Sequence, residues 1–228
     1  VPARAETLLL RPDRVFTAED RLAHPGWAVL VEGERIAAVG PGLAAPAGAR
    51  VVDLPGTTLI PGLIEAHSHL FLHPYDEVVW DDQVLKEPLA YRTARAVRQA
   101  ADTLNSGFTT ERDLGTEGAG SADVGLKRAI DEGIVPGPRL QVATRAIVAT
   151  GGYGPSRKAY AIDDLPQGAQ EASGVDEVVR AVREQAAAGD QDILAAEGFH
   201  LAHGVMHAHA VAGIFKSFDA RHRRALGL

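Results

Sequence analysis

The sequence contains no cysteine and no apolar run long enough to cross a membrane. The absence of cysteine excludes a disulfide framework and thiolate chemistry, and it leaves the redox compartment undecided. Basic residues form no stripe apart from a short run at 221–224, and the formal net charge is −7. These features argue against a nucleic acid or a membrane as partner, and they favour a cytoplasmic location.

The chain has 228 residues, of which 46% are hydrophobic and 23% charged, as is typical of a globular protein with a sizeable core. The first residue is Val, and the single methionine is Met206. A signal peptide or another leading segment that has been removed is therefore an open alternative.

The pattern of the chain changes twice. Residues 1–56 read as short strands separated by glycines, with a hairpin at 31–36, and predict a small β-sandwich domain. Residues 57–189 alternate strand and helix patterns, as in parallel βαβ units. Residues 190–228 follow neither pattern and form a divergent tail with five of the nine histidines: His200, His203, His207, His209 and His222.

Three helices are expected within 57–189. The first begins near Pro88 and ends before Gly107, with its arginines, including Arg92, on a solvated face. The second covers about 123–132. The third starts at Ser173-x-x-Asp176, which is similar to a capping box, and ends at Gly189. Its predicted buried face consists of Val175, Val178, Val179, Val182 and Ala186.

Two histidines follow the apolar run at 59–64 with one residue between them. In a strand, side chains at i and i+2 point the same way, so His67 and His69 would present two imidazoles side by side. Neutral imidazole is a good ligand for zinc and similar divalent metals. A His-x-His pair alone is a weak indication, and two histidines on a hydrated loop are the alternative.

The segment at 61–69, Pro-Gly-Leu-Ile-Glu-Ala-His-Ser-His, resembles the first barrel strand of the amidohydrolase superfamily. Residues 107–115 resemble the second strand, and residues 136–140 lead into a segment similar to the third. The resemblance is strongest to the imidazolonepropionase-like and Xaa-Pro or Xaa-Arg dipeptidase branch, and it covers about residues 7–189. It implies an α/β fold, a (β/α)8 TIM-like barrel preceded by a β-sandwich.

This resemblance also implies a chemistry. His67 and His69 would bind a divalent metal, most often zinc, with one or two ions in the intact family. Metal-activated water would hydrolyse C–N bonds in a small molecule, either a dipeptide derivative or a cyclic amide. The family takes further ligands from a lysine and two histidines on later strands, and an aspartate for proton transfer. None of these four can be placed in this sequence, and no lysine stands at 190–195.

Length limits what this chain can build. A closed (β/α)8 barrel needs about 250 residues, and only roughly 170 remain after the first domain. We therefore expect an incomplete barrel. Two hypotheses follow: a metal-dependent hydrolase, or a truncated, non-catalytic fragment that binds metal weakly. An incomplete barrel also favours association into a homo-oligomer.

Two further residues are candidates for the substrate pocket. His73 follows the His-x-His pair on a loop at the carboxyl end of the predicted strand. Tyr153 stands in a glycine-rich turn where related members often carry histidine, and by this resemblance it would shape the pocket. Glu111 departs from the family pattern, which usually has an apolar residue within that strand. If the strand is buried, an unpaired carboxylate there is costly.

Overall fold

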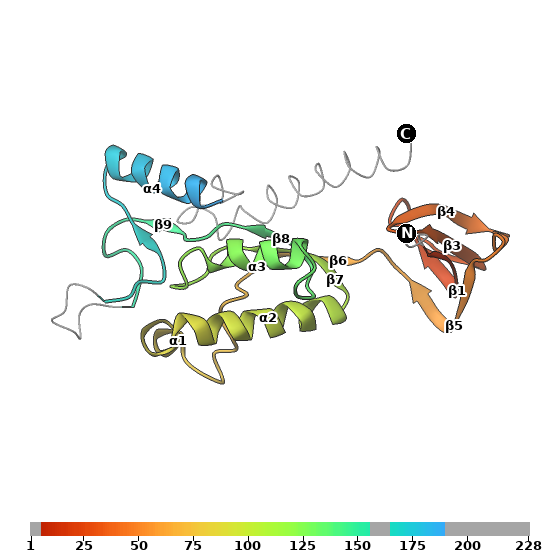
Figure 1. Ribbon diagram of the computed structural model, residues 1–228, viewed down its shortest axis with the longest axis horizontal. Coiled ribbons are helices and arrows are strands. Elements are labelled where there is room, and N and C mark those ends of the chain that lie inside the picture. Colours follow the sequence, from red (N-terminus) through yellow and green to blue (C-terminus); the bar gives the residue numbers. More distant parts are fainter. Residues whose placement is uncertain (1–5, 156–164, 190–228) are drawn as a thin grey trace. The chain divides into compact units, whose positions relative to one another are not determined.

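The structure is a computed structural model that describes residues 6–155 and 165–189. These residues form two units, which divide between Pro61 and Gly62 (Figure 1). Residues 190–228, with the five histidines of the predicted tail, lie outside the described residues. Among the helices that the structure describes, none has the length and apolar character to cross a membrane.

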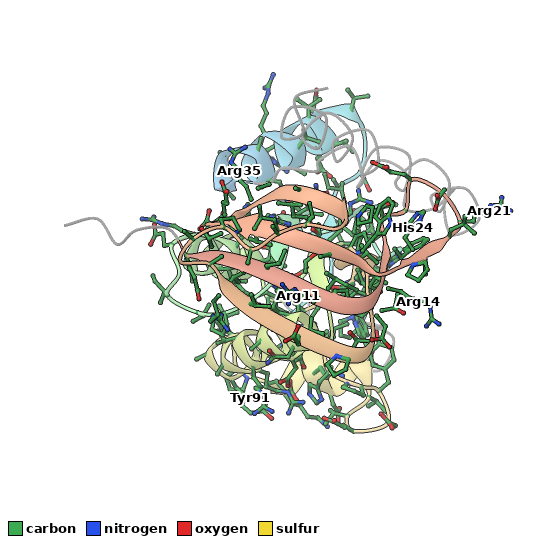
Figure 2. All side chains as sticks on the ribbon, turned by 90° about the vertical axis from the view of Figure 1, so that its right-hand side faces the viewer. Arg11, Arg14, Arg21, His24, Arg35 and Tyr91 are labelled. Atoms are coloured by element: carbon green, nitrogen blue, oxygen red, sulfur yellow. The ribbon has the colours of Figure 1, made fainter. Side chains whose placement is uncertain are left out.

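The first unit is a five-stranded sheet built around β1. This strand pairs antiparallel with β3 and, near its end, with β2, while β5 pairs with it in parallel; β4 is antiparallel to β3. Leu9 and Val29 are buried on these strands. His24, labelled in Figure 2, belongs to β2. Its ring stacks on that of Trp27, with ring centroids 4.0 Å apart. The strands are β1 (Thr7–Phe16), β2 (Ala23–Pro25), β3 (Trp27–Glu32), β4 (Arg35–Pro41) and β5 (Arg50–Leu59).

The predicted hairpin at 31–36 is confirmed. Glu32 pairs with Arg35, and Gly33 adopts a φ of 61°, which the tight turn requires. The last strand of the unit, β5, continues to Leu59 and so passes the predicted domain boundary at residue 56.

The second unit contains three parallel strands in the order β6-β7-β8. Helices α1 and α2 follow β6, and α3 follows β7, so the chain repeats the β/α unit (Figure 1). A core of Phe71, Ala96, Leu126 and Val142 lies between these strands and helices. The elements are β6 (Leu63–Ser68), α1 (Trp80–Lys86), α2 (Leu89–Asn105), β7 (Phe108–Asp113), α3 (Ala122–Asp131) and β8 (Arg139–Val142).

These three strands confirm the predicted fold class, an incomplete β/α barrel. Within the described residues the sheet is open, because β6 and β8 each pair only with β7. After β8 the chain forms a second, short parallel sheet from β9 (Ile147–Val148) and β10 (Gln170–Glu171), followed by α4 (Val175–Ala188).

Helix α2 begins after Pro88 as predicted, but Arg92 belongs to its buried face and is only 2% exposed. The prediction that Arg92 lies on a solvated face is wrong because its guanidinium donates to two backbone carbonyls, those of Phe71 and Thr116. A charged side chain can be buried when hydrogen bonds of this kind replace its hydration.

The predicted face of α4 is wrong in part. Val178 and Val182 are half-buried, but Val175 and Val179 are exposed, and the buried residues are Ala181 and Gln185. The small Ala181 side chain suits close packing, and Gln185 donates a hydrogen bond to the Gln170 side chain on β10. The inner face of this helix thus includes a polar contact with β10 that valine periodicity does not reveal.

Candidate active site

The two histidines of the His-x-His pair lie at the carboxyl end of β6. Their ring centroids are 5.4 Å apart, and the ring planes meet at 73°. His67 is exposed and His69 is partly buried. Ser68, between them, donates a hydrogen bond to Glu111 on β7. The alternation along the strand thus gathers the two imidazoles and directs the intervening side chain to the neighbouring strand.

One nitrogen of His69 is held by the backbone. Its Nδ1 lies 2.9 Å from the carbonyl oxygen of Gly115, in the loop that follows β7. A carbonyl only accepts hydrogen bonds, so Nδ1 carries the proton and the neutral ring leaves the Nε2 lone pair for a ligand. The φ of Gly115 is 144°, a conformation that L side chains rarely adopt, so glycine is favoured where this carbonyl is presented.

A buried carboxylate, Glu117, lies on the same loop. Its Oε1 is 3.9 Å from Nδ1 of His69, and its side chain is 3% exposed. The Trp80 indole donates to Oε2 at 3.0 Å, and the Tyr153 hydroxyl donates at 3.1 Å. Burial raises the pKa of Glu117, while His69, Tyr153 and Trp80 act in the opposite direction.

Glu117 is not among the site residues predicted from the sequence. The available signal is weak: an acidic residue between Gly115 and Gly118 in the loop after the second barrel strand. Its φ of 51° places it in the left-handed region, which is uncommon outside glycine and asparagine. Such backbone strain is a feature of functional loops, and it becomes visible only in the structure.

Tyr153 lies beside Glu117 and packs edge-on against Trp80, with ring centroids 5.5 Å apart. Burial raises the pKa of the Tyr153 phenol, and the neighbouring Glu117 carboxylate raises it further, so the hydroxyl acts as a donor. Tyr153 therefore contacts Glu117, which in turn lies beside His69. Its role in a substrate pocket stays a prediction.

His73 occupies a different environment. Its Nδ1 is 3.1 Å from Glu77 and its Nε2 is 2.8 Å from Glu87, and the side chain is 3% exposed. Gln83 pairs with both the backbone N–H and the carbonyl of the same residue. Because both ring nitrogens already have partners, the geometry favours a role in ordering this loop, and contact with a substrate stays a prediction.

Buried carboxylates gather on β7 and α3. Glu111 is 3% exposed, and Asp113 and Asp123 are fully buried. Burial raises the pKa of Glu111, an effect that the hydrogen bond from Ser68 opposes. Burial raises the pKa of Asp113 well above its ordinary range, and repulsion from Asp123 adds to the rise. Burial of a charged carboxylate costs free energy, so the carboxyl groups of this strand tend to keep their protons.

The Asp113→Asn variant should be more stable than the wild type in alkaline solution. The folded state binds the Asp113 proton more tightly than the unfolded state, so its stabilising contribution is complete below the unfolded pKa of about 3.9 and is lost as pH rises through the folded pKa. Asparagine is neutral throughout. We expect a gain on the order of 1 kcal/mol at high pH that shrinks towards low pH, measured by urea unfolding across pH.

The matched control is Asp131→Asn, which removes an exposed carboxylate that pairs with Lys127 on α3. Its effect on the free energy of unfolding should stay within about 1 kcal/mol. A wild-type stability that rises steadily with pH relative to Asp113→Asn would contradict the prediction.

The sequence model of the amidohydrolase family matches residues 58–212, which is more than half of the chain. The chain belongs to the amidohydrolase family. Short stretches are also similar to curated members: an imidazolonepropionase from Arthrobacter sp. (strain FB24) is 51% identical over 43 residues, 19% of this chain and 11% of the relative. A dihydroorotase from Geobacter sulfurreducens is 57% identical over 42 residues, 18% of this chain and 10% of the relative.

Solved amidohydrolase structures resemble the chain over a longer range. A crystal structure of an amidohydrolase is 32% identical with a TM-score of 0.68, and covers 81% of this chain and 45% of its own. A Xaa-Pro dipeptidase with bound methionine is 25% identical with a TM-score of 0.69 and the same coverage of each chain. The chain therefore spans less than half the length of these solved amidohydrolases.

The donor set at β6 fits the divalent metal that amidohydrolases generally bind. His67 and His69 supply two imidazoles on one strand, and the Gly115 carbonyl orients the second of them. In the part of the chain that the structure describes, no group of three or more His, Cys, Asp or Glu side chains is placed to hold a metal.

Proposed function

We propose that this chain carries the first part of a divalent-metal centre, zinc in the first place, of a hydrolase that cleaves C–N bonds other than ordinary peptide bonds. The observation that carries the proposal is the pairing of His67 and His69 at the end of β6, with Nδ1 of His69 bonded to a backbone carbonyl. Orientation of a ligating imidazole by such a partner is a common property of metal sites.

A bound zinc would lower the pKa of a water molecule and polarise the scissile carbonyl. The chain's own residues have simpler tasks. His67 and His69 would hold the metal through ring nitrogens, and the β7 loop keeps the second ring in place through Gly115. Strand β6 pairs in parallel with β7, with a shift of register between Glu65 and Ser68, and presents both rings at its carboxyl end.

The substrate that we propose is a small molecule, either a dipeptide derivative or a cyclic amide. Similar structures include the Xaa-Pro dipeptidase and a prolidase complexed with N-methylphosphonate-L-proline, which support the first class. The imidazolonepropionase supports the second class. We also propose a cytoplasmic location and association into a homo-oligomer, the latter testable by size-exclusion chromatography with light scattering.

The second candidate function is metal binding without turnover. It is favoured by the finding that the described residues bring no third ligand to His67 and His69. A catalytic zinc normally has three protein ligands and a water molecule, and two imidazoles alone bind zinc weakly.

The experiment measures zinc binding and turnover for the wild-type chain and for the double variant His67→Ala/His69→Ala. The results distinguish the two functions. We expect the double variant to lose at least about 100-fold in zinc affinity, because removal of ligands should exceed the effect of losing an outer partner. The control is His24→Ala, which removes a histidine of the first unit that stacks on Trp27. Chelator competition measures the affinity.

The outcomes separate clearly. Zinc-dependent hydrolysis of a Xaa-Pro dipeptide or an imidazolone-type amide that disappears in the double variant supports the hydrolase. Zinc binding that depends on the pair but brings no hydrolysis supports the second function. Equal zinc affinity in the wild type and the double variant would refute both.

A further inference from the structure

We propose that Glu117 is a positioning residue, which together with the Gly115 carbonyl fixes the tautomer and orientation of the His69 ring. The inference rests on the proposed function, because it assigns the other ring nitrogen of His69, Nε2, to a metal. The contacts that carry it involve Nδ1 and exist without any metal.

Two acceptors of the β7 loop approach the same ring atom. The Gly115 oxygen is 2.9 Å from Nδ1 of His69, and Oε1 of Glu117 is 3.9 Å from it. A carbonyl dipole and a carboxylate both favour a proton on Nδ1 over a lone pair there. Because the carboxylate is buried, its field on the ring is screened less than that of a surface group.

The carboxylate cannot turn freely. The Trp80 indole, on α1, donates to Oε2, and the Tyr153 hydroxyl, after β9, donates to the same oxygen at 3.1 Å. These two donors come from segments on either side of the β7 loop in sequence. The Tyr153 hydroxyl also lies 3.3 Å from Oε1, which is the oxygen nearer to His69.

The aromatic pair that holds Glu117 is itself closely covered. A Cβ atom at Gly168 would lie 2.4 Å from Cζ2 of Trp80 and 3.1 Å from Cε1 of Tyr153. Only a residue without a side chain lets the backbone approach the two rings so closely. The arrangement therefore links α1, the β7 loop, the turn after β9 and the segment before β10 around one carboxylate.

Glu117→Gln tests the inference because the amide keeps the shape and removes the charge. The Trp80 indole can only donate, so the glutamine oxygen takes the place of Oε2 and the NH2 group takes the place of Oε1 on the side of His69. A donor there opposes the proton on Nδ1, which the Gly115 carbonyl still favours, and raises the share of the Nε2–H form. A purely structural role would be fulfilled almost as well by glutamine and would leave the tautomer unchanged.

The first readout is the His69 tautomer in the metal-free chain, measured by long-range ¹H–¹⁵N NMR at a pH well above the ordinary imidazole pKa. The His69→Ala spectrum assigns the signal. We expect the Nδ1–H form to dominate in the wild type and its share to fall in Glu117→Gln, where the Gly115 carbonyl alone still accepts from Nδ1. The second readout is zinc affinity by chelator competition, which should fall about tenfold or more.

Glu77→Gln is the matched control, because Glu77 makes the corresponding contact with Nδ1 of His73. It should leave the His69 tautomer and the zinc affinity at their wild-type values. If Glu117→Gln fails to fold, Glu117→Asp takes its place, since the shorter side chain draws the carboxylate away from Nδ1 of His69 and should lower the share of the Nδ1–H form.

An unchanged His69 tautomer in Glu117→Gln, or in Glu117→Asp where that variant is needed, overturns the inference. A chain that binds no zinc but shows the expected tautomer change refutes the proposed function and leaves the positioning role intact. The two failures are therefore distinguishable.

Discussion

Replacing Arg92 with methionine should lower the free energy of unfolding of the second unit by about 3 kcal/mol. Arg92 is buried on α2, where its Nε donates to the carbonyl of Phe71 at 3.0 Å and its Nη2 donates to the carbonyl of Thr116 at 2.9 Å. Methionine retains most of the apolar stem but leaves both carbonyls without their donors. An unsatisfied buried acceptor costs roughly 1–3 kcal/mol.

Charge adds to this effect. Burial lowers the pKa of Arg92, and the carboxylates of Glu87, Glu117 and Asp113 act in the opposite direction. Removing the guanidinium therefore leaves several buried carboxylates with less compensating charge, which destabilises the folded state further.

Arg98→Met is the matched control on the same helix. Arg98 is exposed and pairs with Asp102 one turn further along α2. Exposed pairs of this kind contribute about 0.3–0.5 kcal/mol. Urea unfolding followed by circular dichroism measures both variants, and equal effects of Arg92→Met and Arg98→Met would show that the buried contacts contribute little.

The Gly62→Ala variant should be destabilised by about 2 kcal/mol. A Cβ atom at Gly62 would lie 2.1 Å from Oγ1 of Thr109, 2.3 Å from its Cγ2 and 2.7 Å from its Cβ. Rotation of the threonine cannot relieve the contact, because its Cβ is itself too close. The start of β6 would have to move away from β7, and this strand carries His67 at its other end.

Two further variants sharpen this test. Thr109→Ala removes the two nearest atoms, so it should partly rescue Gly62→Ala in a double-mutant cycle. Gly125→Ala lies within α3, with nothing within 4 Å of the added carbon, and should stabilise the chain by up to about 1 kcal/mol. A destabilising Gly125→Ala would indicate that both glycine effects have a cause other than the space around the added carbon.

Much of the secondary structure follows from local pattern. The β3–β4 hairpin follows from its glycine turn, and α2 starts after Pro88 because proline suits that position. The His67–His69 pair lies together at the end of β6 because a strand repeats every two residues. These features depend on neighbours in sequence, so the sequence suffices to predict them.

The remaining features depend on contacts between distant segments. Arg92 resembles a surface arginine until the carbonyls of Phe71 and Thr116 are brought to it by β6 and β7. Glu117 acquires its surroundings from Trp80 and Tyr153, which lie 37 and 36 residues away in sequence. Periodicity contains no information about such partners, which explains why the carboxylate beside His69 escapes a sequence-based prediction.

The inner face of α2 has a consequence for how this scaffold could diversify. Arg92 and Gln99 hold the loops after β6 and β7 by donating to the carbonyls of Leu70, Phe71, Leu72 and Thr116. Every amino acid has a backbone carbonyl, so these hydrogen bonds do not depend on which side chains the loops carry. Loop residues could then be exchanged in a library to alter ligand preference, provided that the two donors on the helix are kept.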